Sequence, residues 1–348
     1  ELPKLWAGFV TRWRRLNHEH GTSIAGKRAP DAAVEYLFYQ TIVGLWPAPD
    51  PRLPEGLPSA AVLQDLRERT EGYMLKAVRE AKTHTSWTSP NGEYEAALVT
   101  FVRSLFLSAG SGASPFLSDV QKLVARIARP GFWNSLSRTL IQFTAPGTPD
   151  IYQGDELWNF ALVDPDNRRC VDYQHRKQLL DEVITGVEAP EESRRAFLQE
   201  LVETPEDGRI KLHVIRCALA ARRDHPRLFS AGQYVPLQAS GPAQDHVLAF
   251  ARAADPAPAA SPPSDSRTEA AIVVVARLTA TLPTSPTVAP IGEAVWSGTV
   301  LQLPEQLQNL RWTCAMTRKH LATAPDRSLV VGQALRSFPV ALLVNSTA

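Results

Sequence analysis

The sequence of 348 residues has few cysteines and no long apolar segment. Cys170, Cys217 and Cys314 lie too far apart to indicate a disulfide framework or a zinc site. No apolar run approaches the roughly 20 residues that cross a bilayer, and the first residues lack the charged and then apolar layout of a signal peptide. We therefore expect a protein of the reducing cytoplasm that holds no metal and has no membrane anchor.

A net charge of one sign is also lacking, because 37 Lys and Arg face 36 Asp and Glu, which gives a formal charge of +1. Such a balance produces no field that draws nucleic acid or an anionic membrane, and it indicates an uncharged partner. The basic cluster Arg12, Arg14 and Arg15 is accordingly interpreted as the solvated side of a helix. With 44% hydrophobic and 21% charged residues, the chain is typical of globular proteins and long enough for two domains.

Strand patterns are scarce in the first two thirds of the chain. Apolar residues recur there at helical spacing, and turn residues separate the runs. The predicted helices cover residues 4–20, 31–46, 60–81, 93–107, 114–128, 133–143, 193–203 and 209–223. The Pro-rich residues 47–58 are expected to form a loop, and the Arg129-Pro-Gly break to separate the fifth helix from the sixth. Residues 148–152, behind a Pro-Gly turn, are predicted to form one short buried strand.

The C-terminal third changes character, and short β-type runs with turns between them predict an antiparallel sandwich. These runs are residues 247–252, 271–278, 299–303, 310–316, 328–331 and 340–344. Residues 253–268 are rich in Ala, Pro and Ser, and we expect a mobile loop there between two strands.

A polar and aromatic stretch begins at the predicted short strand and runs over residues 148–173. It contains six carboxylates, two arginines, and several amides and aromatic rings. Sugars bind through this mixture, since planar polar groups pair with adjacent hydroxyls and aromatic faces cover the apolar side of the ring. A rigid loop of ion pairs explains the same composition equally well. It would join Arg168 and Arg169 to Asp164, Asp166 and Asp172.

These segments carry a resemblance to a known family. Pro146-Gly-Thr-Pro-Asp-Ile-Tyr-Gln-Gly-Asp-Glu-Leu resembles the eighth-strand signature of the α-amylase superfamily. Similarity to the maltooligosyltrehalose synthases is carried by Val163-Asp-Pro-Asp-Asn-Arg-Arg-Cys-Val-Asp-Tyr, Lys82-Thr-His-Thr-Ser-Trp-Thr-Ser-Pro-Asn-Gly-Glu-Tyr-Glu and Glu35-Tyr-Leu-Phe-Tyr-Gln-Thr-Ile-Val-Gly-Leu-Trp-Pro. It continues more weakly through His246-Val-Leu-Ala-Phe-Ala-Arg and Ser337-Phe-Pro-Val-Ala-Leu-Leu-Val, and so covers nearly the whole chain.

The resemblance implies an α+β, multidomain fold. Residues 1–228 are expected to be the largely helical C-terminal part of a (β/α)8 barrel of the α-amylase type, with a helical insertion, and residues 229–348 the β-sandwich. The first residue is Glu and the chain opens inside a predicted helix, which indicates a fragment of a longer protein. Without its other strands a barrel leaves an exposed sheet edge, so a dimer of the fragment is a further expectation.

The activity implied by the resemblance is an intramolecular transglycosylation without a cofactor. It converts the reducing-end α-1,4 linkage of a maltooligosaccharide into the α,α-1,1 linkage of trehalose. Retaining chemistry of this kind uses two carboxyls about 5 Å apart. The resemblance places the catalytic carboxylates on strands four, five and seven, the last in a His-Asp-Thr motif that occurs nowhere in the 348 residues. We therefore expect no catalytic residue in this chain, and activity only in the whole protein.

Substrate-binding positions do carry over from the resemblance, in three groups. The first two groups frame the sugar pocket and are Tyr152, Gln153, Asp155 and Glu156, and Asp166, Asn167, Arg168 and Arg169. The third group, expected as a lid over the reducing-end glucose, is Lys82, His84, Ser86 and Trp87. For His84 a purely structural role explains the sequence equally well.

Other readings of the chain stay open. A non-catalytic carbohydrate-binding protein would use the same elements, whereas a helical interaction module would leave the polar stretch unexplained. The chain also departs from the family pattern. Cys170 stands where proline usually follows the Arg-Arg pair, and Trp312-Thr-Cys-Ala-Met-Thr-Arg-Lys replaces the usual Trp-x-Asp-x-Leu-Thr-Gly-Arg. We expect Cys170 to be a plain buried thiol rather than a nucleophile.

Overall fold

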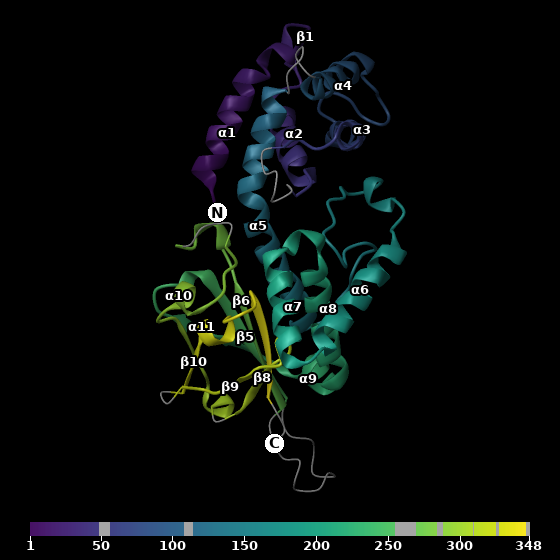
Figure 1. Ribbon diagram of the computed structural model, residues 1–348. Helices are drawn as coiled ribbons and strands as arrows, with labels where there is room; N and C mark the ends of the chain where they lie inside the picture. Colours follow the sequence, from purple (N-terminus) through teal and green to yellow (C-terminus); the bar gives the residue numbers. More distant parts are fainter. Residues whose placement is uncertain are drawn as a thin grey trace. The chain divides into compact units, whose positions relative to one another are not determined.

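The chain folds into two compact units, each made of segments that are not contiguous in sequence. The computed structural model describes residues 1–48, 56–107, 114–254, 269–283, 288–308, 310–324 and 327–345 (Figure 1). Unit 1 comprises Glu1–Ala128 and Phe160–Cys170, and unit 2 comprises Arg129–Asn159 and Val171–Ala348. These divisions fall elsewhere than the domain boundary expected between residues 228 and 229, which stays a prediction. The loops expected at residues 47–58 and 253–268 lie largely outside the described residues.

Unit 1 is built of helices with one short hairpin, β1 and β2. Its elements are α1 (Pro3–Leu16), η1 (His18–His20), β1 (Thr22–Ile24), β2 (Lys27–Ala29), α2 (Ala32–Leu45), α3 (Ala60–Ala81), α4 (Gly92–Phe106), the first part of α5 (Pro115–Thr144) and η2 (Asp166–Arg168). The helices predicted for this region are confirmed, α3 at both ends. Capping explains where they start, since Asp31 accepts from the amides of Ala33 and Val34 and Ser59 accepts from Val62. The hairpin was not predicted.

Aromatic rings form the core of unit 1. Trp13 lies 5.3 Å from Tyr39 and 5.4 Å from Phe116 between ring centroids. Phe38 packs against Phe116 at 5.8 Å and against Phe101 at 5.7 Å. All five rings are at most 2% exposed, so α1, α2, α4 and α5 share one apolar cluster.

A carboxylate is buried within this aromatic core. Glu35, 3% exposed, accepts from the Tyr39 hydroxyl at 2.5 Å and from Arg28 at 2.6 Å. Asn17 donates to the same hydroxyl at 3.1 Å. Burial, followed by the hydrogen bond to Glu35, raises the pKa of Tyr39 far above its ordinary value. The segment that begins at Glu35, one of those carrying the family resemblance, thus lies in the core.

Unit 2 combines helices with two antiparallel sheets. Its helical elements are the second part of α5, α6 (Tyr173–Glu188), α7 (Glu191–Glu203), η3 (Pro205–Asp207), α8 (Arg209–Asp224), α9 (Pro226–Ala231), η4 (Gln244–His246), η6 (Thr279–Thr281), α10 (Glu293–Trp296), η7 (Glu305–Leu307) and α11 (Val331–Ala334). Helices α7 and α8 were predicted, whereas α6, capped by Asp172, was missed. None of the helices among the described residues is long and apolar enough to cross a membrane.

The break expected at Arg129-Pro-Gly is wrong, because α5 runs as one helix from Pro115 through Pro130 to Thr144. Proline removes one helical hydrogen bond and usually ends a helix. Here Val124 before it and Trp133 after it are both buried, at 4% and 1% exposure. Burial of apolar residues on both sides outweighs the lost hydrogen bond.

The strand expected at residues 148–152 is also wrong, since this segment has no sheet partner among the described residues. A strand needs neighbouring strands to accept its hydrogen bonds. Pro146 and Pro149 have no amide hydrogen to offer, and the Asp150 carbonyl instead accepts from the Gln142 side chain. The segment therefore leaves α5 as irregular chain, and no barrel strand is present at this position.

The larger sheet has six strands in the order β3-β5-β6-β11-β8-β9, and the smaller has three in the order β10-β7-β4. Their bounds are β3 (Gln233–Leu237), β4 (Ala239–Ser240), β5 (Val247–Ala254), β6 (Glu269–Ala276), β7 (Val300–Gln302), β8 (Trp312–Cys314), β9 (His320–Leu321), β10 (Ser328–Val330) and β11 (Val340–Asn345). Every strand pair is antiparallel, as predicted for this region. The unpredicted β3 contains Pro236, which is tolerated because β3 is an edge strand.

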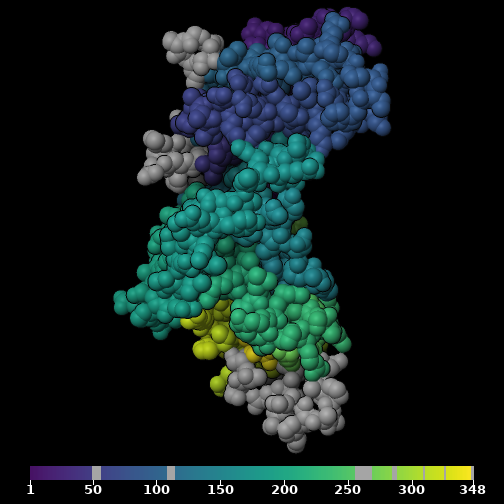
Figure 2. All heavy atoms as spheres, turned by 90° about the vertical axis from the view of Figure 1, so that its right-hand side faces the viewer, coloured from purple at the N-terminus to yellow at the C-terminus, as the bar shows by residue number. Residues whose placement is uncertain are grey.

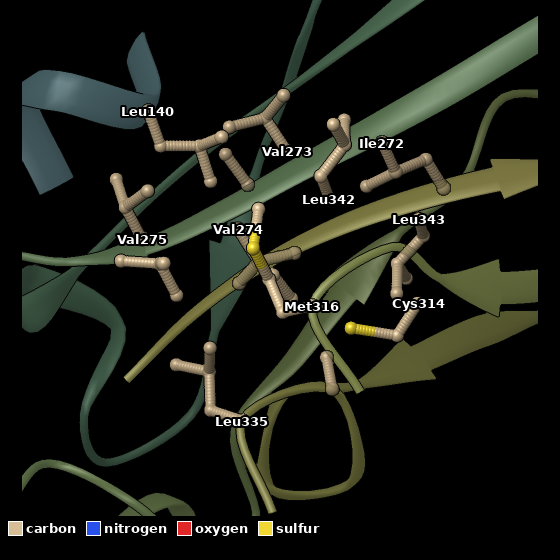
Figure 3. Packing of buried hydrophobic residues seen from close by; sticks show 14 of the residues in the cluster. Leu140, Ile272, Val273, Val274, Val275, Cys314, Met316, Leu335, Leu342 and Leu343 are labelled. Carbon is tan, nitrogen blue, oxygen red and sulfur yellow. The ribbon is translucent and has the colours of Figure 1, made fainter. Parts of the chain in front are cut away.

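The larger sheet is buried on both faces at its centre. Seven consecutive residues of β6 are buried, which alternation between one wet and one dry face cannot produce. Figure 3 shows Leu140 of α5 beside Val273 and Val275, with Val274 and Met316 on the other side of the strands. In the same core cluster, β7 and β10 of the smaller sheet contribute Leu301 and Leu329.

Helices cover one side of this sheet. Figure 1 shows α7, α8 and α9 on one side of β5, β6 and β8, with α10, α11 and β10 on the other. In Figure 2, the view from the side of α6 to α9, teal and green atoms cover most of the yellow atoms of the C-terminal residues. The hydroxyl of Ser137 in α5 donates to the Ala276 carbonyl at 2.7 Å, so polar as well as apolar contacts hold α5 on the sheet.

Candidate functional site

The first group of predicted residues lies in unit 2, on the turn that follows α5. The Asp155 amide donates to the Tyr152 carbonyl at 3.0 Å, which closes the turn, and Gly154 takes a positive φ of 95°. The Tyr152 side chain is 47% exposed and Gln153 is exposed as well. The turn thus presents one aromatic ring and one amide to solvent.

The two carboxylates of this turn are held by neighbours. Glu156 accepts from Arg176 at 3.1 Å, and the same guanidinium donates to the Gly154 carbonyl at 3.0 Å. Asp155 accepts from Asn159 at 2.7 Å. Since each carboxylate is held through one of its oxygens, Asp155 and Glu156 fix the shape of the turn. Arg176 escaped sequence analysis because α6 was not predicted.

Lys211 of α8 also contacts this turn. Its ammonium donates to the Leu157 carbonyl at 3.0 Å and lies 5.6 Å from the centre of the Trp158 ring. Burial lowers the pKa of Lys211, and the charges of Asp155 and Glu156 oppose that shift. A partly buried cation therefore balances the two carboxylates.

The second group lies in unit 1, on the loop of residues 160–170. Asp166 accepts two hydrogen bonds from Arg69 of α3, at 2.9 and 2.8 Å, and one from the Leu162 amide at 2.7 Å. Burial opposes ionisation of Asp166, but these hydrogen bonds outweigh it and hold the pKa of Asp166 below its ordinary value. Asp166 therefore helps to fix the loop on α3, together with the Phe160 and Asp164 carbonyls, which accept from Arg69 and Lys76.

The other members of the second group lie nearer the surface. Arg168 pairs with Asp164, with 71% and 47% of the two side chains exposed. Arg169 pairs with Asp65 at 2.9 Å, again largely in solvent. Exposed pairs of this kind are weak, so both guanidiniums remain available to a ligand. The rigid loop of ion pairs is thus present in part, with Asp65 and Arg69 as partners that spacing did not indicate.

Asn167 differs from its neighbours. Its Oδ1 atom is buried and has no hydrogen-bond partner among the described residues. A buried acceptor without a donor is costly, so Asn167 lowers the stability of the loop as it stands. Cys170, at the end of the same loop, is an exposed free thiol, so the buried position expected for it is wrong, because the end of this surface loop lies in solvent. Cys217 and Cys314 are buried.

The third group follows α3 and is also part of unit 1. Lys82 ends α3 in the left-handed conformation, with φ of 57°. The His84 ring stacks on Tyr94 at 4.6 Å, and its Nε2 lies 2.6 Å from the Asp31 carboxylate. Both contacts are what a structural histidine makes. They leave His84 fixed in place, partly buried.

Trp87 is the exposed aromatic ring of the third group. It is 57% exposed, and Arg79 lies 4.9 Å from its ring centre. Arg79 in turn donates twice to Glu95, which also accepts from Thr85 at 2.6 Å. The hydrogen bonds from Arg79 and Thr85 lower the pKa of Glu95 to about 2.

Ser86 lies in the tight bend beside Trp87. Its hydroxyl accepts from the Ser89 amide at 3.0 Å, and its own amide donates to the Ser89 carbonyl at 3.2 Å. These contacts hold the bend that carries the exposed ring. Ser86 therefore shapes the loop.

The structure brings the predicted residues together within each group, with one group in unit 2 and two in unit 1. In all three groups, some members hold a turn or loop and others present an aromatic ring or a hydrogen-bonding group to solvent. Within the described residues, no cluster of three or more His, Cys, Asp and Glu side chains is arranged to hold a metal ion.

Comparison with known proteins gives the chain its relatives. No protein-family model matches it. Two proteins from strains of Mycobacterium tuberculosis, both assigned by name as maltooligosyl trehalose synthases, are 34% identical over all 348 residues, which make up 35% of their length. The chain therefore spans about a third of the length of these curated relatives.

Solved structures of maltooligosyltrehalose synthases are also similar to this chain. The maltooligosyltrehalose synthase of Arthrobacter ramosus is 30% identical, with a TM-score of 0.63 over 97% of this chain and 35% of the other. A second maltooligosyl trehalose synthase structure, 23% identical, has the same fold over 99% of this chain and 36% of its own, with a TM-score of 0.65. Over its whole length, in sequence and in fold, this chain is similar to about one third of the length of a maltooligosyltrehalose synthase.

Proposed function

We propose that this chain is the part of a maltooligosyltrehalose synthase that frames the sugar-binding pocket, while the catalytic carboxylates lie outside it. The observation that carries the proposal is the similarity of all 348 residues to proteins of that name. The reaction is the conversion of the reducing-end α-1,4 linkage of a maltooligosaccharide into an α,α-1,1 linkage, carried out in the cytoplasm by the whole protein. The residues belong to the C-terminal part of its barrel and the domain that follows.

The arrangement of each group supports a role in binding glucose units. Tyr152 and Trp87 are exposed rings on turns that other residues hold in place, and a flat ring covers the apolar face of a sugar at little cost in entropy. The Gln153 amide and the guanidiniums of Arg168 and Arg169 supply hydrogen bonds to hydroxyls. These side chains bind, whereas Asp155, Glu156 and Asp166 hold the loops in shape.

Polar groups held in this way suit a mutase, which must keep the released glucose in place until it attacks the glycosyl group again. Water that enters at this stage produces hydrolysis instead. We propose that the loop with Lys82, His84, Ser86 and Trp87 covers the reducing-end glucose. Lys82 is exposed and reaches solvent from the end of α3, so its ammonium is free to donate to a sugar oxygen.

The proposal is tested by calorimetric titration of the 348-residue chain with maltopentaose, beside an assay for a non-reducing product. We expect saturable binding and no product. A product would overturn the statement that the catalytic carboxylates lie elsewhere. If maltopentaose produced no heat at any accessible concentration, the chain would have no sugar-binding role of its own.

Two substitutions locate the binding. Trp87→Ala and Tyr152→Ala should each weaken maltopentaose binding by roughly threefold to tenfold, since an aromatic stacking contact is worth about 0.5 to 1.5 kcal/mol. Tyr234→Ala is the matched control, because Tyr234 is 48% exposed but belongs to neither group. If Tyr234→Ala weakened binding as much as the other two, the assignment of the sugar site would be wrong.

A further inference from the structure

Unit 2 contains a cavity whose lining includes none of the residues of the three groups described above. It has a volume of about 750 Å³ and is formed by α7, the turn between β8 and β9, and the chain after α11. This is the size of a pocket that holds a small metabolite. Leu198 and Val202 of α7, both 6% exposed, form part of its apolar wall.

Positive charge dominates the lining of this cavity. Its carboxylates are Glu191 and Glu203, and Glu203 already accepts from Gln199 at 2.7 Å. His320 is a further lining residue. The lining also contains five cationic residues, which are Arg194, Arg195, Arg318, Lys319 and Arg336.

None of these five cationic side chains forms a hydrogen bond or an ion pair within the described residues, whereas arginines elsewhere in the chain do so repeatedly. Unpaired cations gathered around a cavity repel one another unless an anion lies between them. Planar guanidiniums are suited to phosphate oxygens, which they bind in pairs. Five cations against two carboxylates leave an excess of positive charge in the lining, which favours an anionic ligand.

Arg318 occupies a backbone position that a side chain takes only at a cost. Its φ is 58°, in the left-handed region that glycine adopts freely. No side-chain contact of Arg318 within the described residues offsets that strain, yet Arg318 lines both this cavity and the adjacent one of about 820 Å³. A strained residue that supplies an unpaired charge to a cavity is consistent with a ligand-binding role.

We propose that this cavity binds a small phosphate monoester with a hydroxyl-bearing body, of the size of a hexose phosphate. Arg318 and Arg336, with Arg194 and Arg195 of α7, bind the phosphate. The side chains of Thr317, Ser337 and Gln199, also in the lining, bind the hydroxyls. A nucleic acid fits less well, because the whole chain carries a formal charge of only +1. The proposal does not depend on the one made above.

The test is calorimetric titration of the 348-residue chain with inorganic phosphate, glucose 6-phosphate and glucose, at low ionic strength and without maltopentaose. We expect saturable binding of glucose 6-phosphate, weaker binding of phosphate, and none of glucose at this cavity. Absence of binding by both phosphates would overturn the proposal. Equal affinity for both would overturn its hydroxyl-bearing part, and a single-stranded oligonucleotide that displaced glucose 6-phosphate would overturn the assignment to a small molecule.

Arg318→Gly locates the site without endangering the fold, since glycine fits the left-handed backbone better than arginine does. It should weaken glucose 6-phosphate binding about tenfold, the loss expected for one charge-assisted contact, while leaving the unfolding temperature unchanged or higher. Arg336→Gln should act in the same direction. Arg227→Gln removes an exposed charge from α9, outside the cavity, as the matched control. If all three variants weakened binding equally, the attraction would be general, and the proposed site would be wrong.

Discussion

The two units are stabilised in different ways. In unit 1 the carboxylate of Glu35 is buried among aromatic rings and that of Asp166 binds a surface loop to α3, whereas the core of unit 2 consists mainly of strands with aliphatic side chains. Glu35 with its partners and Asp166 with Arg69 are directional contacts that fail when one atom is removed. The buried strands β6 and β11 rely on area and fit. Unit 1 should therefore respond to removal of single polar atoms and to pH, and unit 2 to removal of volume.

The largest effect is expected in the sheet of unit 2. Leu342→Ala empties space at a residue that is fully buried and pairs with Val273 across the sheet. It should lower the free energy of unfolding by roughly 2 to 5 kcal/mol, measured by urea denaturation. Leu219→Ala in α8, where the side chain is 44% exposed, is the control and should change little. Similar losses in both variants would mean that the sheet does not dominate the stability of unit 2.

The next effect is expected from a single oxygen in unit 1. Tyr39→Phe removes the hydroxyl that donates to Glu35 and accepts from Asn17 while keeping the ring. The free energy of unfolding should fall by about 1 to 3 kcal/mol, because buried polar partners are left unsatisfied. Tyr234→Phe removes a hydroxyl from a 48% exposed residue of unit 2 and should be neutral. A neutral Tyr39→Phe would remove the contrast between the units.

A smaller and local effect is expected at the loop of residues 160–170. Asp166→Asn weakens the double hydrogen bond with Arg69, which should cost roughly 1 kcal/mol because the asparagine oxygen still accepts one of the two bonds. Amide hydrogen exchange in the loop should accelerate about fivefold, with little change elsewhere. Asp164→Asn, which breaks the more exposed pair with Arg168, is the control and should leave exchange unchanged.

The same carboxylate makes the loop sensitive to acid. Since the pKa of Asp166 is depressed in the folded protein, its contribution is complete above the unfolded pKa of about 4 and is lost as the pH falls through the lower, folded value. Loop exchange in the unmodified chain should therefore accelerate, relative to the rest of unit 1, below about pH 4. Asp166→Asn should lack this acid-dependent step. A step of the same size in the variant would assign it to another group.

How far the fold follows from the sequence depends on whether the deciding contacts are local. Helix α3 was predicted from end to end, because helical spacing and the Ser59 cap lie within the segment itself. The continuous α5 was not predicted, because proline usually ends a helix. Here the burial of apolar residues before and after Pro130 outweighs the hydrogen bond that proline removes. The prediction of a strand at residues 148–152 also failed on contacts outside the segment, since a strand needs partner strands that its own residues do not specify.

The candidate site shows the same limit. Its composition marked the turn with Tyr152 and the loop with Asp166 as polar and aromatic, and the structure describes both as ordered surface features. Their supports come from far along the chain: Arg69 lies 97 residues from Asp166, and Lys211 lies 54 residues from Leu157. No spacing rule links such pairs. Which carboxylates fix a loop and which face a ligand is therefore visible only in the folded chain.

The smallest expected effect concerns the end of α3. It arises from backbone conformation, which affects stability in the same way in both units. Lys82 has a φ of 57°, so Lys82→Gly should raise the free energy of unfolding by roughly 0.5 to 1 kcal/mol. Ala77→Gly, within the same helix, should lower it by about 1 kcal/mol, since glycine there adds only freedom to the unfolded chain. Opposite signs in thermal unfolding would establish that the left-handed backbone is strained at Lys82. If both variants lowered stability, side-chain contacts of Lys82 would outweigh the strain, and its ammonium would not be the free donor that the proposed lid requires.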